Sequence, residues 1–317
     1  MRILVTGSEG SLMQAVIPKL MANGHEVIGV DKCGPHSDPP GYLFYEKDLV
    51  QMTDRWYAGR IDMVIHAAAT IYGVGGFNAY CGDILSNDLV MTRNMLRFAA
   101  LNDVKKFVSL SSSMVYERCP SHSTGVEEAE VDWQSYQVPL TDYGLSKYTG
   151  ERMVKAFNVQ YGLPYVIWRP FNIITPYEHA KGAPGTSHVF ADFFDAILKK
   201  KMELIPILGS GNQTRCFTWI HDVAQAIADF SEKAEGAYNI GSTEEVTMLE
   251  LAKLIWVLSG RDPTALRFNF LKPYINDVMR RKPNVDKIAM DFGWTAKTTL
   301  TQSIGHCLDY YKGLGYT

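Results

Sequence analysis

The sequence predicts an α/β protein built on a doubly wound parallel sheet of the Rossmann type, with a smaller mixed α/β C-terminal part. Buried-strand and helical patterns alternate over residues 1–172, which is typical of a parallel sheet with helices on both faces. A glycine-rich turn joins the first strand to the first helix. The composition then changes, because residues 174–187 contain two Pro and two Gly and have no clear period. We expect about 215–243 to rejoin the main sheet, and 173–214 and 244–317 to form the smaller part.

Each expected element follows from the hydrophobic period of its segment. Continuous or alternating apolar runs predict strands of the main sheet at 2–6, 25–30, 42–46, 61–69, 106–110, 165–168 and 237–241. Helical periodicity predicts helices at about 11–21, 86–101, 142–161, 190–200, 221–230, 247–259 and 300–311, and shorter strands are expected at 205–211 and 213–220. Thr247 and Glu250 have the spacing of a capping box at the start of their helix.

The composition excludes several classes of function. The chain has 317 residues, of which 46% are hydrophobic and 21% charged, so we expect a sizeable packed core. A net charge of −3 argues against a nucleic-acid partner. The five Cys form no C-x-x-C pair and the eight His are dispersed, which predicts reduced thiols, a cytoplasmic location and no metal site. We find no signal peptide and no run of transmembrane length, and so expect no membrane partner.

The first strand, turn, helix and second strand have the arrangement of a dinucleotide-binding unit. Gly7 permits a tight turn, and Gly10 lets backbone amides approach a pyrophosphate at the helix N-terminus. Asp31 ends the second strand, where a carboxylate would accept hydrogen bonds from ribose hydroxyls and repel a 2′-phosphate. NAD is therefore expected as cofactor in preference to NADP. The residues assigned to this part of the site are Gly7, Gly10, Ser11, Leu12 and Asp31.

Met13 occupies the position of the third glycine in this fingerprint, where helix and strand usually pack closely. One hypothesis is that the helix shifts slightly and the site still closes on NAD. The other is a structural turn without a cofactor, in a degenerate protein that binds its ligand without turnover.

Further candidate residues follow the later strands. Asp48 could cap the next helix, which is the commoner role for an isolated Asp, or with Leu49 contact an adenine ring. Ala67 and Ala68 are small enough for a cofactor to approach the sheet edge, although alanines there are also ordinary packing. The glycine-rich stretch 72–77 is expected to be a loop that either flanks a ligand or is simply flexible.

Tyr143 and Lys147 lie one helical turn apart, and so on one face of the expected helix. A neighbouring ammonium favours the phenolate, and a phenol acidified in this way can act as a general base. Hydroxyl side chains, Ser112 among them, leave the strand before that helix and could hold an alcohol substrate. Taken alone, the Tyr143–Lys147 spacing favours an ordinary surface helix, and the hydroxyl run without Tyr143 favours a solvated loop.

The chain as a whole resembles the extended short-chain dehydrogenase/reductase family, in its nucleotide-sugar epimerase/dehydratase branch. The resemblance rests on motifs that occur in one order: Thr6-Gly7-x-x-Gly10, Asp31, Asp48-Leu49, His66-Ala67-Ala68, Ser112-x-x-Val115-Tyr116, Tyr143-x-x-x-Lys147, Arg169-Pro170-Phe171-Asn172 and Gln213-x-Arg215-x-Phe217. It implies that Tyr143 is the catalytic base, that Lys147 lowers its pKa and holds the nicotinamide ribose, and that Ser112 binds the reacting sugar oxygen. It also implies a nucleotide-diphosphate sugar held by Ser112, Ser113, Asn172, Arg215 and Arg281, and a homodimer formed through the helices near 86–101 and 143–161.

The residue before Val115-Tyr116 discriminates between reactions of this branch. Dehydratases, decarboxylases and 3,5-epimerases of the family have an acid or a thiol there, whereas this chain has Met114, whose thioether cannot exchange a proton. We therefore expect 4-epimerisation through a transient 4-keto sugar. The alternatives are a 4-keto-sugar reductase and an enzyme like GDP-mannose 3,5-epimerase, to which 75–77 and 181–184 are similar.

Overall fold

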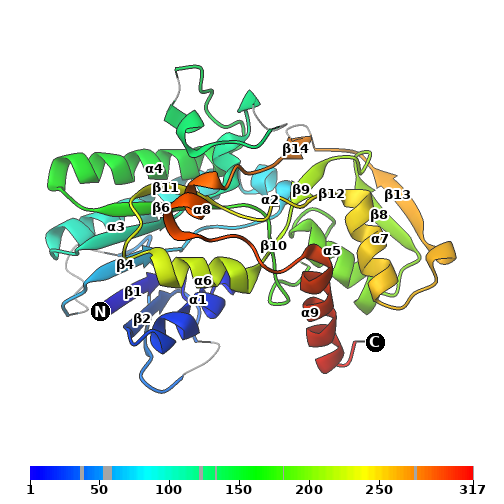
Figure 1. Ribbon diagram of the computed structural model, residues 1–317, viewed down its shortest axis with the longest axis horizontal. Coiled ribbons are helices and arrows are strands. Elements are labelled where there is room, and N and C mark those ends of the chain that lie inside the picture. Colours follow the sequence, from blue (N-terminus) through cyan, green and yellow to red (C-terminus); the bar gives the residue numbers. More distant parts are fainter. Residues whose placement is uncertain are drawn as a thin grey trace.

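The computed structural model describes residues 1–35, 39–52, 59–120, 124–132, 134–180, 182–274 and 277–316. Within them, a seven-stranded parallel sheet has the strand order β11-β6-β5-β4-β1-β2-β3 (Figure 1). The predicted doubly wound sheet is confirmed, including the return of the strand near 237–241 beside β6. The strands are β1 (Arg2–Thr6), β2 (Glu26–Asp31), β3 (Leu43–Glu46), β4 (Met63–His66), β5 (Lys106–Leu110), β6 (Tyr165–Pro170) and β11 (Gly236–Ile240).

Helices cover both faces of the sheet because alternate strand residues point to opposite sides. Ile3 and Val5 belong to the apolar core under α1 (Ser11–Ala22) and α6 (Ile220–Phe230). Leu4 belongs to the core under α3 (Cys81–Leu101) and α4 (Asp142–Tyr161). Figure 1 shows the two helix pairs on opposite sides of the strands.

The strand order reverses between β1 and β4, and this reversal positions the site. The chain winds outward from β1 through β2 to β3, then returns to β4 on the other side of β1. Ligands of open α/β sheets bind in the crevice outside the carboxyl ends of the strands at such a switch point. The turns after β1 and β4 therefore face one crevice.

The remaining strands form three small sheets towards the other end of the molecule (Figure 1). They pair β7 (Ile173–Ile174) with β10 (Thr218–Trp219), β9 (Thr214–Cys216) with β12 (Glu245–Thr247) and β14 (Arg280–Arg281), and β8 (Leu204–Leu208) with β13 (Arg267–Leu271). The helices around them are α5 (Val189–Phe194), continued by a π-helical turn (Asp195–Lys199), α7 (Met248–Leu258), α8 (Asp286–Phe292) and α9 (Leu300–Gly313). The predicted capping box is confirmed at the start of α7.

Four local predictions need correction. The strand expected at 213–220 is divided into β9 and β10, which belong to different small sheets. The glycine-rich stretch 72–77 was expected as a loop, but α2 (Val74–Ala79) begins inside it, because the backbone of Gly73 and Gly75 pairs with Thr186 and Gly185. The next helix, α3, begins at Cys81 instead of 86. The strand expected at 61–69 contains only Met63–His66, since the small residues after it belong to the ligand-side turn. Short 3₁₀ turns occur at Ser113–Tyr116, Glu128–Asp132 and Pro263–Ala265.

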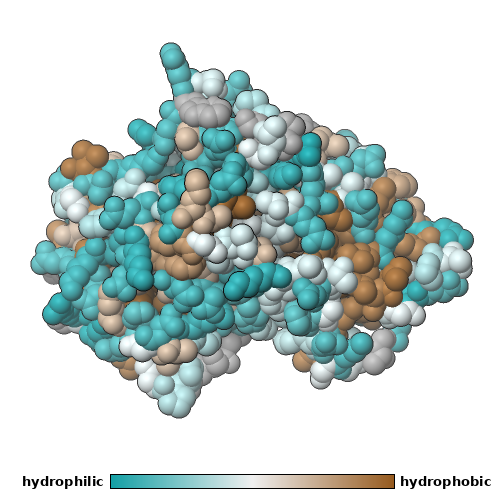
Figure 2. All heavy atoms as spheres, in the orientation of Figure 1, coloured by the Kyte–Doolittle hydropathy of each residue, from teal (hydrophilic) through white to brown (hydrophobic). Residues whose placement is uncertain are grey.

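The surface carries apolar side chains at the end with the small sheets. Figure 2 shows this apolar area near α7, and Leu204, Val257 and Phe270 are among the exposed large apolar residues. Among the described residues, no helix is both long and apolar enough to cross a membrane. All five cysteines are free thiols.

Candidate functional site

The turn after β1 has the shape that a dinucleotide pyrophosphate needs. Gly7 has a φ of +66°, and a Cβ there would lie 2.7 Å from the backbone of Ala68. Any larger residue would therefore push β1 and the turn after β4 apart. Gly10 caps α1, where neither a side-chain cap nor an acidic residue occupies the first turn at Ser11 and Leu12. The helix N-terminus thus presents backbone amides to an anion, as a phosphate site requires.

Met13 does not distort this turn. Its side chain is 1% exposed and belongs to the core between α1 and the sheet. The helix is regular from Ser11 to Ala22 around it. The missing third glycine is thus replaced by a packed thioether side chain within a regular helix, and closure of the site on NAD stays a prediction.

Asp31 lies at the edge of the same crevice. Its carboxylate accepts hydrogen bonds from the amides of Glu9 at 3.1 Å and Cys33 at 3.2 Å. A second acidic side chain, that of Glu9, lies near the same edge. The Tyr42 hydroxyl donates to Glu9 Oε1 at 3.4 Å, and the charges of both Glu9 and Asp31 act on this phenol. Burial raises the pKa of Tyr42 to about 12, so the phenol stays a donor. Two carboxylates at this edge are compatible with a ribose diol and unfavourable for a 2′-phosphate.

The two other cofactor candidates next to this crevice have structural partners. Asp48 accepts a hydrogen bond from the amide of Val50 at 2.9 Å within a turn, and no helix begins at 49–52, so the expected helix-capping role is not observed there. Leu49 is buried, and its carbonyl accepts from Asn94 Nδ2 of α3 at 2.8 Å. Their contacts with an adenine ring stay predictions.

A buried carboxylate fixes the start of α4. Thr141 caps the helix by accepting from the amide of Gly144 at 3.0 Å. Glu117 accepts from the amides of Leu140 at 2.7 Å and Thr141 at 2.9 Å, and from the Thr141 hydroxyl at 2.7 Å. Glu117 therefore joins the turn after β5 to the helix that carries the candidate catalytic pair. Glu117 was not among the predicted site residues, because nothing in its local sequence pattern distinguishes it from a solvated acid.

Tyr143 and Lys147 lie on one face of α4 as predicted. Lys147 Nζ lies 5.6 Å from the centroid of the Tyr143 ring and donates to the carbonyl of Leu110 at 3.4 Å. The Tyr143 ring is buried and stacks on Phe77 of α2, with centroids 4.5 Å apart and planes 5° from parallel. The phenol and the ammonium thus share the carboxyl end of β5.

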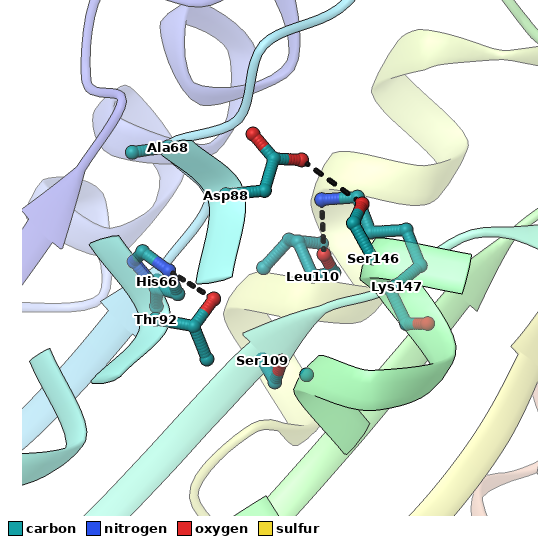
Figure 3. A pocket seen from close by; sticks show the side chains of 10 residues that line it. His66, Ala68, Asp88, Thr92, Ser109, Leu110, Ser146 and Lys147 are labelled. Carbon is teal, nitrogen blue, oxygen red and sulfur yellow. Dashed lines mark hydrogen bonds between the residues drawn. The ribbon is translucent and has the colours of Figure 1, made fainter. Parts of the chain in front are cut away.

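A polar pocket surrounds Lys147 (Figure 3). His66 bridges Thr6 at 2.8 Å and Thr92 at 3.2 Å, and burial followed by the charge of Lys147 lowers its pKa to about 3, so the imidazole is neutral. Asp88 also lines the pocket, and burial raises its pKa. Neither His66 nor Asp88 was assigned a chemical role from the sequence. The lining residues are His66, Ala68, Asp88, Thr92, Ser109, Leu110, Ser111, Ser146, Lys147 and Gly150.

The serine turn after β5 lies beside the Tyr143 ring. Ser112 Oγ accepts from the amide of Met114 at 3.2 Å and begins a 3₁₀ turn, which leaves its hydroxyl proton available as a donor. Met114 packs in one apolar cluster with Tyr143 and Phe77. Ser113 is buried and accepts from Arg281 at 3.3 Å. The residue expected to discriminate between reactions is thus adjacent to the phenol.

Arg215, Arg281 and Asn172 were predicted to hold the substrate, and both arginines are buried. Arg215 pairs with Asp277 at 2.7 Å, whereas Arg281 contacts Ser113 and the sulfur of Met114 and forms no ion pair with a carboxylate among the described residues. Burial and then the charge of Arg215 lower the pKa of Arg281 to about 9. Arg281 Nε and Asn172 Oδ1 are buried polar atoms without a hydrogen-bond partner in the described part of the chain. Buried orphans of this kind fit an anionic, hydroxyl-bearing ligand.

A histidine–glutamate pair borders the same region and was also missed. His188 Nδ1 lies 2.8 Å from both carboxylate oxygens of Glu178, and the positive charge of Arg281 is near enough to act on His188. Burial lowers the pKa of His188, but the carboxylates of Glu178 and Asp192 together outweigh it, so the net pKa is raised. Only the three-dimensional pairing identifies these two residues, since they lie on a stretch without a clear period.

Comparisons with known proteins agree with this geometry. The model of the NAD dependent epimerase/dehydratase family matches residues 3–241. A putative UDP-glucose 4-epimerase of Methanocaldococcus jannaschii is 29% identical over 317 residues, with 98% of each chain covered. GDP-mannose 3,5-epimerase 1 of Oryza sativa subsp. indica is 29% identical over 272 residues, covering 83% of this chain and 70% of the relative. The crystal structure of a Thermotoga maritima UDP-glucose 4-epimerase with UDP-glucose superposes with a TM-score of 0.83 at 25% identity, covering 99% of each chain.

The chain belongs to the NAD dependent epimerase/dehydratase family. The family resemblance and the fold class drawn from the sequence are confirmed. The prediction that the cofactor is NAD is confirmed by membership of this family. The chain fits it, since the uncapped helix N-terminus after Gly7 and the carboxylate of Asp31 match a pyrophosphate and a ribose.

Proposed function

We propose that this protein is an NAD-dependent nucleotide-sugar 4-epimerase. The observation that carries the proposal is the arrangement around Tyr143: Lys147 lies one turn away, and Met114 packs against the ring where a proton-exchanging group would otherwise lie. The division into an NAD-binding domain (1–172, rejoined at about 215–243) and a substrate-binding domain (173–214 and 244–317) is part of the same proposal.

Each of the three catalytic residues then has a role in the reaction. Tyr143 takes the proton from the C4 hydroxyl of the sugar and returns it to the C4 oxygen later in the cycle. Lys147 stabilises the phenolate and holds the nicotinamide ribose, and the Ser112 hydroxyl donates to the C4 oxygen. When bound, NAD supplies the hydride acceptor and donor at C4. The proton and the hydride both return to the sugar, so the reaction leaves no net redox change.

The substrate side would hold the diphosphate and let the sugar turn over. Arg281 and Arg215 provide two guanidinium groups, and Asn172 provides an amide. Arginine forks match phosphate oxygens in a bidentate manner, and a buried guanidinium without a carboxylate gains most from such a ligand. When the diphosphate is held firmly, the sugar ring can turn over and present the other face of its C4 carbon.

Two measurements test the proposal. Purified protein is denatured and the released ligands are identified by mass spectrometry, which we expect to yield NAD. The protein is then incubated with UDP- and GDP-linked hexoses, and products are separated by chromatography. A 4-epimerase interconverts C4 epimers while absorbance at 340 nm stays flat.

Two further measurements identify the alternatives. Net consumption of NADH with a 4-keto sugar would identify a reductase, and absence of binding at millimolar NAD⁺ would identify a non-catalytic protein.

A second candidate function is epimerisation at the carbons next to C4, as in the GDP-mannose 3,5-epimerases that this chain also matches. The observation that favours it is the His188–Glu178 pair beside Arg281, because it could supply the acid–base group that Met114 cannot. The test is turnover in D₂O. Deuterium at C3 or C5 that disappears in His188→Gln supports this reaction, and product without deuterium supports simple 4-epimerisation.

We further propose a cytoplasmic homodimer formed through α3 and α4, which pack against each other. Apolar side chains on the outer parts of these helices, such as Leu101 and Val159, are exposed in the single chain. Sedimentation equilibrium of wild-type protein and of Val159→Lys would test the dimer.

A further inference from the structure

Asp88 is a buried carboxylate that shares the pocket of Figure 3 with Lys147. It lies on α3 and is 4% exposed. Its carboxylate accepts from the amide of Thr70 at 2.8 Å and lies 3.3 Å from the Ser146 hydroxyl, which also lies 2.9 Å from the carbonyl of Tyr143 and donates to one of the two at a time. One side chain therefore connects the turn after β4, the helix α3 and the residue that precedes Lys147.

The hydrogen bonds of Asp88 do not by themselves require a charged side chain at this position. An amide would accept the same two hydrogen bonds, whereas a carboxylate loses hydration on burial. Burial accordingly raises the pKa of Asp88, and the charge of Lys147 acts in the opposite direction. Lys147 is the cationic side chain in the pocket, since His66 is neutral at every pH above about 3.

The other charged groups near Lys147 and Tyr143 are already compensated or lie further out. Glu151 of α4 is ion-paired with Arg169 at 2.6 Å. Glu117 accepts three hydrogen bonds at the start of α4. Arg281 lies on the substrate side, next to Ser113. Asp88 is thus the carboxylate placed to act on Lys147 from within the pocket.

We propose that Asp88 is a positioning residue that ties the turn carrying Ala67 and Ala68 to α4 and supplies the counter-charge of Lys147. The activity arm of this inference rests on the proposed function. A negative charge raises the pH at which each neighbouring group loses its proton. We therefore expect the pH dependence of turnover to change when this charge is removed.

The first experiment measures kcat/KM for epimerisation against pH in wild type, Asp88→Asn and Asp88→Glu. Asp88→Asn keeps the shape and removes the charge, so both limbs of the profile should move to lower pH by about one unit. Asp88→Glu should return the profile towards wild type. The matched control is Asp83→Asn, which removes an exposed carboxylate from the same helix and should leave the profile in place. A folded Asp88→Asn enzyme with an unshifted profile would overturn the proposal.

The second experiment does not depend on turnover, and so separates this inference from the proposed function. Melting temperatures are measured for Asp88→Asn, Lys147→Gln and the double variant. Coupling between the two side chains predicts that the double variant loses less than the sum of the single changes. Lys147→Gln alone should lose more at pH 8 than at pH 5, because the unpaired carboxylate is ionised at the higher pH. Additive changes, or an equal loss at both pH values, would contradict the proposal even if Asp88→Asn failed to fold.

Discussion

Arg215 and Arg281 are direct register partners in the parallel pair β9–β14, yet among the residues that the structure describes only Arg215 has a carboxylate, Asp277, at ion-pair distance. Both side chains are buried. Two adjacent guanidinium groups with one counter-charge leave a net positive charge inside the molecule. A diphosphate of a nucleotide sugar would neutralise it and would give Arg281 Nε the partner that it lacks among the described residues.

The first prediction concerns this unpaired arginine. Arg281→Met should raise KM for the nucleotide sugar roughly 10- to 100-fold, because one charge-assisted contact with phosphate is lost. Its melting temperature should stay the same or rise, because a buried charge without an ion-pair partner disappears. The matched control is Arg280→Met: Arg280 is the adjacent residue of β14, exposed and paired with Glu245. Equal effects of the two changes on KM would contradict the assignment.

The second prediction concerns the phenol. Tyr143→Phe should lower kcat by about 10²- to 10⁴-fold, since a general base is removed while the ring still stacks on Phe77. NAD affinity should change little. Tyr148→Phe, on the same helix and packed against Tyr136, should keep its activity. Single-turnover formation of NADH, followed at 340 nm, distinguishes loss of chemistry from loss of binding.

The third prediction concerns Met13. Restoring the third glycine by Met13→Gly should destabilise the protein by about 3–6 kcal/mol, because it empties a fully buried site and places glycine within a helix. It should bring no gain in NAD affinity. Met290→Gly, at an exposed helical position, should cost only about 1 kcal/mol. Chemical denaturation and calorimetric titration with NAD measure both quantities, and tighter NAD binding by Met13→Gly would show that Met13 impairs the cofactor turn.

The fourth prediction concerns Glu117. Glu117→Ala leaves the amides of Leu140 and Thr141 and the Thr141 hydroxyl without their acceptor, which should cost about 2–4 kcal/mol. Because Ser112 and Tyr143 lie on the two segments that Glu117 joins, kcat should fall more than KM rises. The control is Glu127→Ala, at an exposed acid. Unchanged kcat in Glu117→Ala would mean that Thr141 alone fixes the helix start.

Local patterns were sufficient for the main sheet and for the residues that share one turn of chain. Gly7 and Gly10 could be predicted because a strand–glycine–helix sequence defines its own geometry, and Tyr143 and Lys147 because helical spacing places them on one face. The helix at Val74–Ala79 could not be predicted in this way. Its glycines are held by backbone pairing with 185–186, a contact between segments far apart in the sequence.

The parts of the site that were missed depend on such long-range contacts. Asp88 and Glu117 are ordinary acids in the sequence, and become special only when α3 and the turn after β5 pack against α4. Asp277 was also missed, because only the packing of its segment beside β9 brings it to Arg215, and no local period indicates this contact. The sequence similarity to the family supplied Arg215 and Arg281, but not the unequal charge compensation of the pair.

The last prediction concerns His66 and the pH dependence of stability. Burial, with a smaller contribution from Lys147, lowers the pKa of His66 from 6.5 to about 3 in the folded chain. The unfolded chain takes up a proton below about pH 6.5, whereas the folded chain cannot do so until about pH 3. Stability that is present above pH 6.5 should therefore be lost progressively as the pH falls towards 3, by an amount on the order of 4 kcal/mol. His66→Asn removes the titrating group, so the gap in unfolding free energy between variant and wild type should shrink on acidification between pH 6.5 and 4. His306→Asn, at an exposed position, should run parallel to wild type over this range. If the gap in unfolding free energy does not change over this range, the imidazole takes up its proton in the folded protein as it does in the unfolded chain. Lys147 would then face a second cation in its pocket.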